Sequence, residues 1–297
     1  MRHVIGRSDG IRESTLAFVV AGLCAFVQPA CATDLGPSTL QQFDHYIQLA
    51  ERRIELASHE PFLWVDRLPA DRRAVAQSQL RAGQVVIERL DANVADAEND
   101  LTKPILVSGG IIHHWVGTVF IPGATLAETI AFEQDYDHHQ DYFRPNVMRS
   151  KILRREGNDF IIQLRLLEKK VITTVIDTQQ EVHYQFVGPT QAWSRSQATR
   201  IQEVDHAGEV DERLEPAGHD RGFLWRMNTY WRFEESDGGT YVECQSISLT
   251  RDIPTGLGWL IEPYLTSVPR ESLTFTLATT RSQVSKRIAA RTAQIAP

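Results

Sequence analysis

Apolar and polar residues alternate with a period of two along most of the middle of the chain, which predicts a long series of β-strands. Turn-forming residues separate these segments, for example at 156–159, 188–189 and 236–239. We expect strands at residues 84–90, 112–121, 147–155, 160–167, 171–177, 181–187, 193–204, 223–235 and 240–250. Two short helical segments, 126–134 and 137–142, interrupt them, and the polar residues 91–100 are expected to form a loop. The pattern therefore predicts one long antiparallel sheet.

Helical periodicity replaces this alternation before the sheet. Ser38 and Gln41 have the Ser-x-x-Gln spacing of a capping box, and the helix that follows is expected to end near residue 59. Its apolar stripe consists of Leu40, Phe43, Ile47, Ala50, Ile54 and Ala57. A second helix is expected over residues 70–82 and is stopped by Gly83. Residues 33–83 are therefore expected to form a helical appendage that precedes a domain spanning residues 84–297.

A long helix is expected at the C-terminal end of the chain. The last strand stops at Ile253-Pro254, and residues 256–264 are interpreted as a tight, apolar linker with a short helical turn. Pro269 is expected to begin the final helix. Its apolar residues Leu273, Leu277, Val284 and Ile288 lie roughly on one face.

The first 32 residues have the pattern of a secretory signal peptide. Three arginines precede an apolar run over residues 16–27, and Ala30-Cys31-Ala32 supplies small residues at the cleavage site. About twelve apolar residues are too few for a bilayer span, which needs roughly 20, and Gln28-Pro29-Ala30 is a poor lipobox before Cys31. We expect a periplasmic or secreted protein, cleaved after about Ala32.

Composition narrows the class of protein. The chain has 297 residues, of which 42% are hydrophobic and 23% are charged, as in ordinary globular proteins. Its net charge of −7, with no basic run, argues against nucleic acid as a partner. Cys244 is the one cysteine beyond the expected cleavage site, so no intramolecular disulfide is expected and stability must come from a packed core.

The order strand, helical pair, long sheet, terminal helix resembles the START/SRPBCC superfamily, which includes polyketide cyclases and lipid-transfer-like proteins. The matching segments are Ile121-Pro-Gly123, Tyr142-Phe-Arg-Pro-Asn-Val147, Ile253-Pro-Thr-Gly-Leu-Gly-Trp-Leu260 and Pro269-Arg-Glu-Ser-Leu273. The resemblance covers about residues 108–292. It implies an α+β helix-grip fold, in which a curved antiparallel sheet wraps around a long C-terminal helix and an apolar cavity between them holds a hydrophobic molecule. The superfamily also contains enzymes, so the fold alone does not decide the function.

His113 and His114 are the first candidates for chemistry. Because they are consecutive on a strand, their side chains point to opposite faces and cannot both bind one metal ion. Alternatively, one histidine makes a hydrogen bond in the wall of the sheet and the other lies under the helical appendage or at the surface. We expect His114 to face the cavity, where its replacement should weaken ligand binding. Asp137-His138-His139 offers a further set of metal ligands, but Asp137 is placed as a helix N-cap, so neither a metal nor a cofactor is expected.

Charged and aromatic residues of the strands give two open interpretations. Polar residues at 226, 228, 230 and 232 alternate along one face, with 243 and 245 on the next strand, as expected of a solvated outer face. Alternatively Arg165, or Arg232 with Glu243, points inward and holds a polar head group. Aromatic residues expected to line the cavity are Trp115, Tyr184, Trp231, Trp259 and Tyr264.

Motifs for covalent or nucleotide chemistry are lacking. The sequence has no Gly-x-Ser-x-Gly and no phosphate-binding or dinucleotide-binding glycine pattern, and Cys244 is interpreted as a buried apolar side chain. No catalytic residues are therefore assigned. The favoured function is an exported, non-catalytic protein that binds or carries a hydrophobic small molecule, expected to be a lipid.

Two alternatives stay open. The first is a cyclase or aromatase-type enzyme, which a deeply placed polar residue with a perturbed pKa would favour. The second is a subunit of an envelope complex, which an exposed stripe of Phe43, Ile47 and Ile54 would favour. Transient contact with a membrane surface and the oligomeric state are also left open.

Overall fold

The structure is a computed structural model that describes residues 33–56, 61–90, 107–169, 173–252 and 258–295. Side chains are not described for residues 33–34, 55–56, 258–266 and 295. The expected signal peptide, the expected loop at 91–100 and the start of the expected linker lie outside the described residues.

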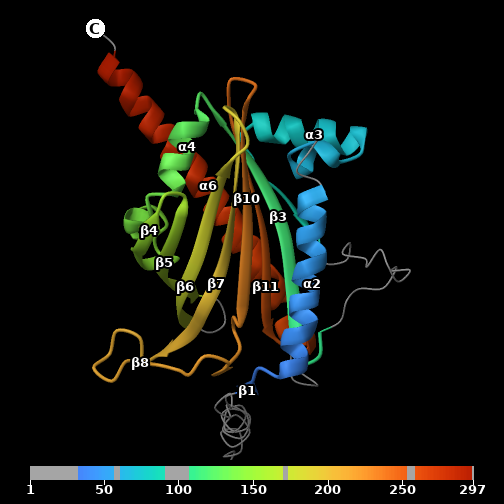
Figure 1. The fold of residues 1–297 in the computed structure, drawn as a ribbon, viewed down its shortest axis with the longest axis vertical. Coiled ribbons are helices and arrows are strands. Elements are labelled where there is room, and N and C mark those ends of the chain that lie inside the picture. The colour runs from blue at the N-terminus through green and yellow to red at the C-terminus, as the bar shows by residue number, and fades with distance from the viewer. Residues whose placement is uncertain (1–32, 57–60, 91–106, 170–172, 253–257, 296–297) are drawn as a thin grey trace, which may run out of the picture. The chain divides into compact units, whose positions relative to one another are not determined.

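One large antiparallel sheet dominates the described chain (Figure 1). Its strands are β2 (Val86–Arg89), β3 (Gly110–Pro122), β4 (Val147–Glu156), β5 (Asp159–Lys169), β6 (Thr173–Phe186), β7 (Gln191–Asp205), β10 (Arg226–Ser236) and β11 (Gly239–Arg251). They lie in the order β2-β3-β11-β10-β7-β6-β5-β4, and β8 (Arg213–Leu214) pairs with β7. A separate short ribbon pairs β1 (Thr33–Asp34) with β9 (His219–Asp220).

The helices are placed around this sheet. Before it come α2 (Pro37–Leu56), the 3-10 helix η2 (Trp64–Arg67) and α3 (Ala70–Arg81). After β3 come α4 (Leu126–Glu133), η4 (Tyr136–His138) and α5 (His139–Tyr142). The chain ends in α6 (Gly258–Ile295), which crosses behind the strands in Figure 1, whereas α2 runs alongside β3. The predicted α+β helix-grip fold is confirmed.

Two predicted boundaries are wrong. The strands expected at 171–177 and 181–187 form one strand, β6, because the polar residues between them remain paired and a bulge at Gln179 and Gln180 absorbs the irregularity. The final helix begins at Gly258 and not at Pro269, so most of the expected linker is helical. A proline removes one backbone hydrogen bond, but Pro269 does not end or begin this helix.

The sheet has two faces, which we name by what covers them. On the inner face, Leu273, Leu277 and Val284 of α6 pack with Val119 and Ile121 of β3. Gly117 lies under Leu277 on this face, where a Cβ atom would come within 2.6 Å of the leucine side chain. The close approach of α6 to β3 therefore depends on a glycine.

The outer face is covered by the N-terminal helices. Phe43 and Ile47 of α2 are buried against Ile112, Ile247 and Leu249 of the sheet. A second cluster joins Phe62, Leu63, Val65 and Leu80 to Phe120 and Tyr241. The apolar stripe of α2 thus packs on the sheet, and the exposed stripe that would favour a docking subunit is not found in the described part of the chain.

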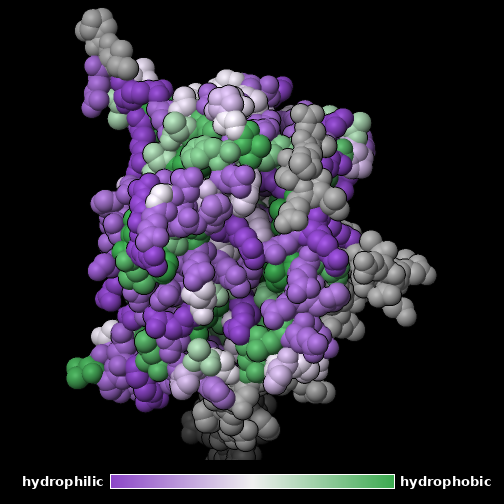
Figure 2. Space-filling view, viewed as in Figure 1, coloured by the Kyte–Doolittle hydropathy of each residue, from purple (hydrophilic) through white to green (hydrophobic). Residues whose placement is uncertain are grey.

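Between α2 and the β4–β5 hairpin, the outer face is open to solvent. The outward-pointing residues Glu181, His183, Arg195 and Gln197 of β6 and β7 are exposed, and Figure 2 shows a largely hydrophilic surface over these strands. The solvated face expected on β10 and β11 is therefore not found there, because the N-terminal helices cover these strands, and the exposed polar side chains lie on β6 and β7 instead.

Candidate functional site

In the middle of β10, the inner face is less buried than the outer face. On β10, the outward-pointing residues Asn228, Tyr230 and Arg232 are buried, whereas the inward-pointing Thr229 and Trp231 are only half-buried. A helix-covered inner face would ordinarily be the more buried one. Part of the inner face, at Thr229 and Trp231, is therefore accessible.

The accessible residues of three adjacent strands lie next to one another. Trp115 of β3 is directly opposite Ser246 of β11, and Ser246 is directly opposite Thr229 of β10. All three are half-buried, as is Trp231 two residues beyond Thr229. We call these four residues, Trp115, Thr229, Trp231 and Ser246, the inner-face strip. It offers two indole rings and two hydroxyl groups to whatever lies against it.

Buried polar atoms border the strip without partners. His113 Nδ1 and Trp115 Nε1 are buried on the inner face and have no hydrogen-bond partner among the described residues, and the buried Ser194 hydroxyl lies beside the Tyr184 hydroxyl. His113 and Ser194 are each only 1% exposed. Ser194 lies opposite Trp231 in the ladder between β7 and β10. Because buried polar groups are ordinarily hydrogen-bonded, two such atoms on one face indicate a place where a bound molecule completes the bonding.

A buried carboxyl group stands over the same region. The Thr125 N-cap and Glu128 form a capping box that begins α4, and the spacing from Leu126 and Ile130 places Glu133 on the buried face of that helix. Glu133 is 5% exposed, and its Oε1 accepts a hydrogen bond from Thr280 of α6 at 2.9 Å. Burial raises the pKa of Glu133 to about 7, although the Thr280 hydrogen bond opposes the shift.

Two buried tyrosines lie close to Glu133. The Tyr136 and Tyr184 hydroxyl oxygens are 2.7 Å apart, so one donates a hydrogen bond to the other. Burial raises the pKa of both phenols, and the charge of Glu133 adds to the shift. Burial also raises the pKa of the Cys244 thiol, again with a contribution from Glu133. Glu133 therefore lies within electrostatic reach of the row formed by Tyr184, Ser194 and Cys244, and these thiol and phenol groups are neutral.

The eight predicted ligand-binding residues do not form one site. Trp115, Tyr184 and Trp231 lie on the inner face, as expected. His114, Arg165 and Arg232 lie on the outer face. Trp259 and Tyr264 belong to α6, but their side chains lie outside the described part.

The prediction that His114 faces the cavity is wrong, and His113 has the inward position. His114 is buried under α2, where the Tyr46 hydroxyl is 2.8 Å from its Nδ1 and Gln245 Nε2 is 2.6 Å from its Nε2. Burial lowers the pKa of His114 to about 3, so the ring is neutral. On the other face, His113 Nε2 is 3.0 Å from the Thr250 hydroxyl.

The two arginines proposed to hold a head group are occupied on the outer face. Arg165 binds Asp177 through two hydrogen bonds of 2.6 and 2.9 Å and also pairs with Glu212 at 2.9 Å. Two carboxylates saturate its guanidinium, so it offers no free positive charge to a ligand.

Arg232 and Glu243 meet across the strands, as expected, but they lie beneath the N-terminal segment. Arg232 Nη1 donates to Glu243 Oε1 at 3.2 Å, and its Nη2 donates to the backbone oxygen of Ile54 at 2.8 Å. The backbone N–H of Trp64 donates to Glu243 Oε2 at 2.6 Å. The pair therefore attaches Ile54 and Trp64 to the sheet instead of binding a head group.

The predicted alternative metal ligands have separate partners. Asp137 accepts a hydrogen bond from the Ile152 N–H, His138 pairs with Asp135, and the buried His139 ring donates to the backbone oxygen of Glu133. Elsewhere in the described chain, His206, Glu209 and Asp211 come close together in an exposed loop. His206 and Asp211 are hydrogen-bonded to each other at 2.5 Å.

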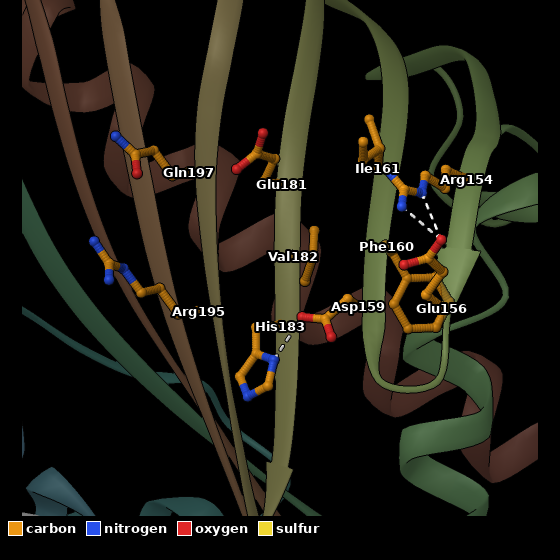
Figure 3. Close-up of a pocket in the computed structure, with 10 residues that line it drawn as sticks. All are labelled: Arg154, Glu156, Asp159, Phe160, Ile161, Glu181, Val182, His183, Arg195 and Gln197. Carbon is orange, nitrogen blue, oxygen red and sulfur yellow. Dashed lines mark hydrogen bonds and ion pairs between the residues drawn. The ribbon is translucent and has the colours of Figure 1, made fainter.

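A hollow opens on the outer face of the sheet, beside the β4–β5 hairpin (Figure 3). It lies between the β4–β5 hairpin and the strands β6 and β7, and charged side chains line much of it. Several of these charges are already paired, since Arg154 pairs with Glu156 and His183 with Asp159, as the dashed lines of Figure 3 show. An open hollow of paired charges does not suit a hydrophobic ligand.

Glu133 is the main functional candidate that the sequence interpretation missed. It follows Leu126 by seven residues and Ile130 by three, so it lies on the apolar stripe of a predicted helix. A carboxylate at such a position signals a buried, functional or strongly paired group. Its partner Thr280 belongs to the threonine-rich part of the last helix and gave no comparable signal.

Comparisons with known proteins concern the fold. No protein-family model matches the chain, and no curated protein matches it. A STAR-related lipid transfer protein fragment from Xanthomonas axonopodis is 16% identical, with a TM-score of 0.42 over 60% of this chain and 95% of that chain. The Zhui aromatase/cyclase from Streptomyces sp. R1128 is 13% identical, with a TM-score of 0.40 over 60% of this chain and 96% of that chain. Human STARD10 is 9% identical, with a TM-score of 0.41 over 74% of this chain and 83% of that chain.

The helix-grip fold is established by the strand order and the terminal helix of this chain, and not by these low sequence identities and TM-scores. None of the helices in the described ranges combines the length and the hydropathy that a membrane span requires.

Proposed function

We propose that this protein binds a hydrophobic small molecule between the inner face of the sheet and α6. The observation that carries the proposal is the pair of buried inner-face atoms without partners among the described residues, His113 Nδ1 and Trp115 Nε1, together with the half-buried inner-face strip. Apolar ligand surface buried there gains about 25 cal/mol per Å² before the costs of association. The unpartnered polar atoms would then orient the molecule.

The separation between Ser194 and Trp115 on the inner face favours an elongated or planar ligand. Ser194 on β7 and Trp115 on β3 are separated by two intervening strands, β10 and β11. Neighbouring strands lie about 4.8 Å apart, so these two polar groups are separated by roughly 14 Å across the sheet. An acyl chain or a fused ring system of that length would contact both.

The proposal includes a carrier role outside the cytoplasm. Its support is the signal-peptide pattern of residues 1–32 together with the binding face described above. Amino-terminal sequencing of the protein from periplasmic and culture fractions tests export, and an intact Met1 in the cytoplasmic fraction alone would contradict it.

Native mass spectrometry tests binding. Protein purified without detergent, or delipidated and then incubated with a total lipid extract, should retain a non-covalent adduct of small-molecule mass. Binding should also change the fluorescence of Trp115 and Trp231, so Trp115→Phe should reduce the change, whereas Trp64→Phe on the outer face should not. A protein that takes up nothing from the extract in either measurement contradicts the proposal.

Glu133 favours one second candidate, an enzyme that moves a proton on the bound molecule. A carboxyl group with a pKa of about 7 in an apolar interior can act as a general acid or base at neutral pH. Comparison of the mass and the NMR spectrum of the ligand before and after prolonged incubation separates the two functions. Carriage predicts that both stay unchanged. A dehydrating enzyme lowers the mass by one water, proton transfer or ring closure without dehydration changes the spectrum alone, and either activity should be lost in Glu133→Gln.

A further inference from the structure

The buried inner face carries no positive charge, and this limits what it can bind. Among the described residues, the one buried arginine or lysine is Arg232, and its guanidinium is on the outer face with Glu243. The buried histidines toward α6, His113 and His139, are neutral because burial lowers the pKa of each to about 4. An anionic head group would therefore find no described cation in the interior.

Cations at the margins of the inner face are exposed or already paired. Arg89 lies on the edge strand β2, is exposed and has an interaction of its own. Arg155 is exposed and lies over the ring of Phe160. Arg221 pairs with the fully buried Glu203 at 2.7 Å. None of the three offers an unpaired charge inside.

The interior instead presents hydroxyl groups, an indole N–H and a carboxyl group. Ser194 Oγ can both donate and accept, and Trp115 Nε1 can only donate. Glu133 adds an acceptor, and its negative charge, when present, repels a second anion. A ligand hydroxyl or carbonyl oxygen satisfies Trp115, and a ligand hydroxyl can also donate to Ser194 or Glu133.

We propose that the ligand of this site is uncharged and carries a hydroxyl or carbonyl oxygen, and that long-chain carboxylates are discriminated against, with Glu133 as the specificity-determining residue. This inference rests on the proposed binding function. It divides lipid-like molecules into neutral alcohols, esters and ketones, which fit, and fatty-acid anions, which do not. Transferring an unpaired anion into such an interior costs enough to weaken its binding by at least about tenfold relative to the matched alcohol.

Three pyrene-labelled probes with the same hydrocarbon chain test the inference: the carboxylic acid, its methyl ester and the corresponding alcohol. Dissociation constants are measured by fluorescence at pH 8, where both the probe carboxylate and Glu133 are ionised. The alcohol and the ester should bind at least about tenfold more tightly than the acid. In Glu133→Gln, this ratio should fall by several-fold, whereas Glu181→Gln, the same change at an exposed site on the outer face, should leave it unchanged.

Each other outcome has a distinct meaning. Acid binding as tight as alcohol binding in the unaltered protein overturns the inference without any variant and leaves the binding function intact. A ratio that is the same in Glu133→Gln and in the unaltered protein overturns the role of Glu133. If none of the three probes binds, the proposed function itself fails, and this inference fails with it.

Discussion

Buried polar atoms without partners distinguish the inner face of β3 from the outer face of the central sheet. On the outer face, Arg232 is bound by Glu243 and by the backbone of residue 54, and both ring nitrogens of His114 have neighbours within 2.8 Å. On the inner face, buried polar atoms of His113 and Trp115 have no partner among the described residues. Polar groups of both kinds occupy the same strands, only one or two residues apart.

Coverage explains the difference. The outer face of β10 is closed by helices that bring their own partners, so each buried polar group there has a role in attaching those helices. The inner face is closed only in part by α6, and the inner-face strip stays half-buried. Where helices cover a face completely, residues of the chain supply the hydrogen-bond partners of its buried polar groups. Where a face is covered only in part, a ligand can supply them. Substitutions on the two faces should accordingly affect different quantities, stability on one and binding on the other.

The largest expected effect is the loss of the buried outer-face ion pair. Arg232→Met leaves Glu243 buried without its cation, and burial already raises the pKa of that carboxyl group. We expect the free energy of unfolding in urea to fall by about 3 to 5 kcal/mol. Probe affinity of the folded protein should not change.

The double variant Arg232→Met/Glu243→Leu is the control. It removes both charges together, so it should be more stable than Arg232→Met alone. A single variant that unfolds at the same urea concentration as the unaltered protein would contradict the assignment of this pair as the attachment of Ile54 and Trp64 to the sheet.

The next largest effect concerns Glu133 and depends on pH. Its folded pKa of about 7 lies above the ordinary value of 4.5, so the folded state binds the proton more tightly than the unfolded state. The associated stability is fully present below pH 4.5 and is lost as the pH rises through about 7. Glu133→Gln should therefore be more stable than the unaltered protein by up to about 3 kcal/mol at pH 8, with little difference at pH 4.5.

Urea unfolding of both proteins at the two pH values checks this, with Glu181→Gln as the exposed control. Histidines with lowered pKa values add an opposite slope, but they are common to both proteins and cancel in the difference. A difference between the proteins that is the same at both pH values would mean that the folded pKa is not raised.

The contrast between the faces also explains how far the sequence could be interpreted. The strand period correctly predicts the helix-grip order of elements and separates His113 from His114. It cannot tell which of the two faces α6, because both faces of β3 are apolar: one packs on α6 and the other on α2 and η2. Polar alternation on β10 looked like a solvated face because periodicity does not reveal that α2 covers it.

Arg165 and Glu133 show the other reason for missed residues. Arg165 was a reasonable head-group ligand until the ladder placed it opposite Asp177, a partner twelve residues away that composition alone does not identify. The position of Glu133 on an apolar helical stripe can be recognised in the sequence. Its hydrogen-bond partner Thr280 of α6, 147 residues later, cannot. Pairings at such a distance are set by the fold and not by local pattern.

A smaller effect is expected for the indole N–H on the inner face. Trp115→Phe keeps most of the aromatic surface and removes the buried Nε1 donor, which has no partner among the described residues. Probe affinity should fall by about tenfold, while the free energy of unfolding should change little, because no hydrogen bond within the protein is lost. Trp64→Phe on the outer face should leave affinity unchanged, and an equal loss in both variants would mean that Trp115 does not contact the ligand.

The smallest expected effect tests the opposite face at the same level of the sheet. Tyr46→Phe removes the hydroxyl group that lies 2.8 Å from His114 Nδ1, while Gln245 remains beside Nε2. The variant leaves the Nδ1 atom of the neutral His114 ring without this hydrogen bond. The free energy of unfolding should therefore fall by about 1 kcal/mol. Affinity for the alcohol probe should stay within about twofold of the unaltered protein, because α2 and His114 lie on the side of the sheet away from α6. If Tyr46→Phe weakens binding as much as Trp115→Phe does, the two faces are coupled through the sheet, and the separation of stability from binding does not hold.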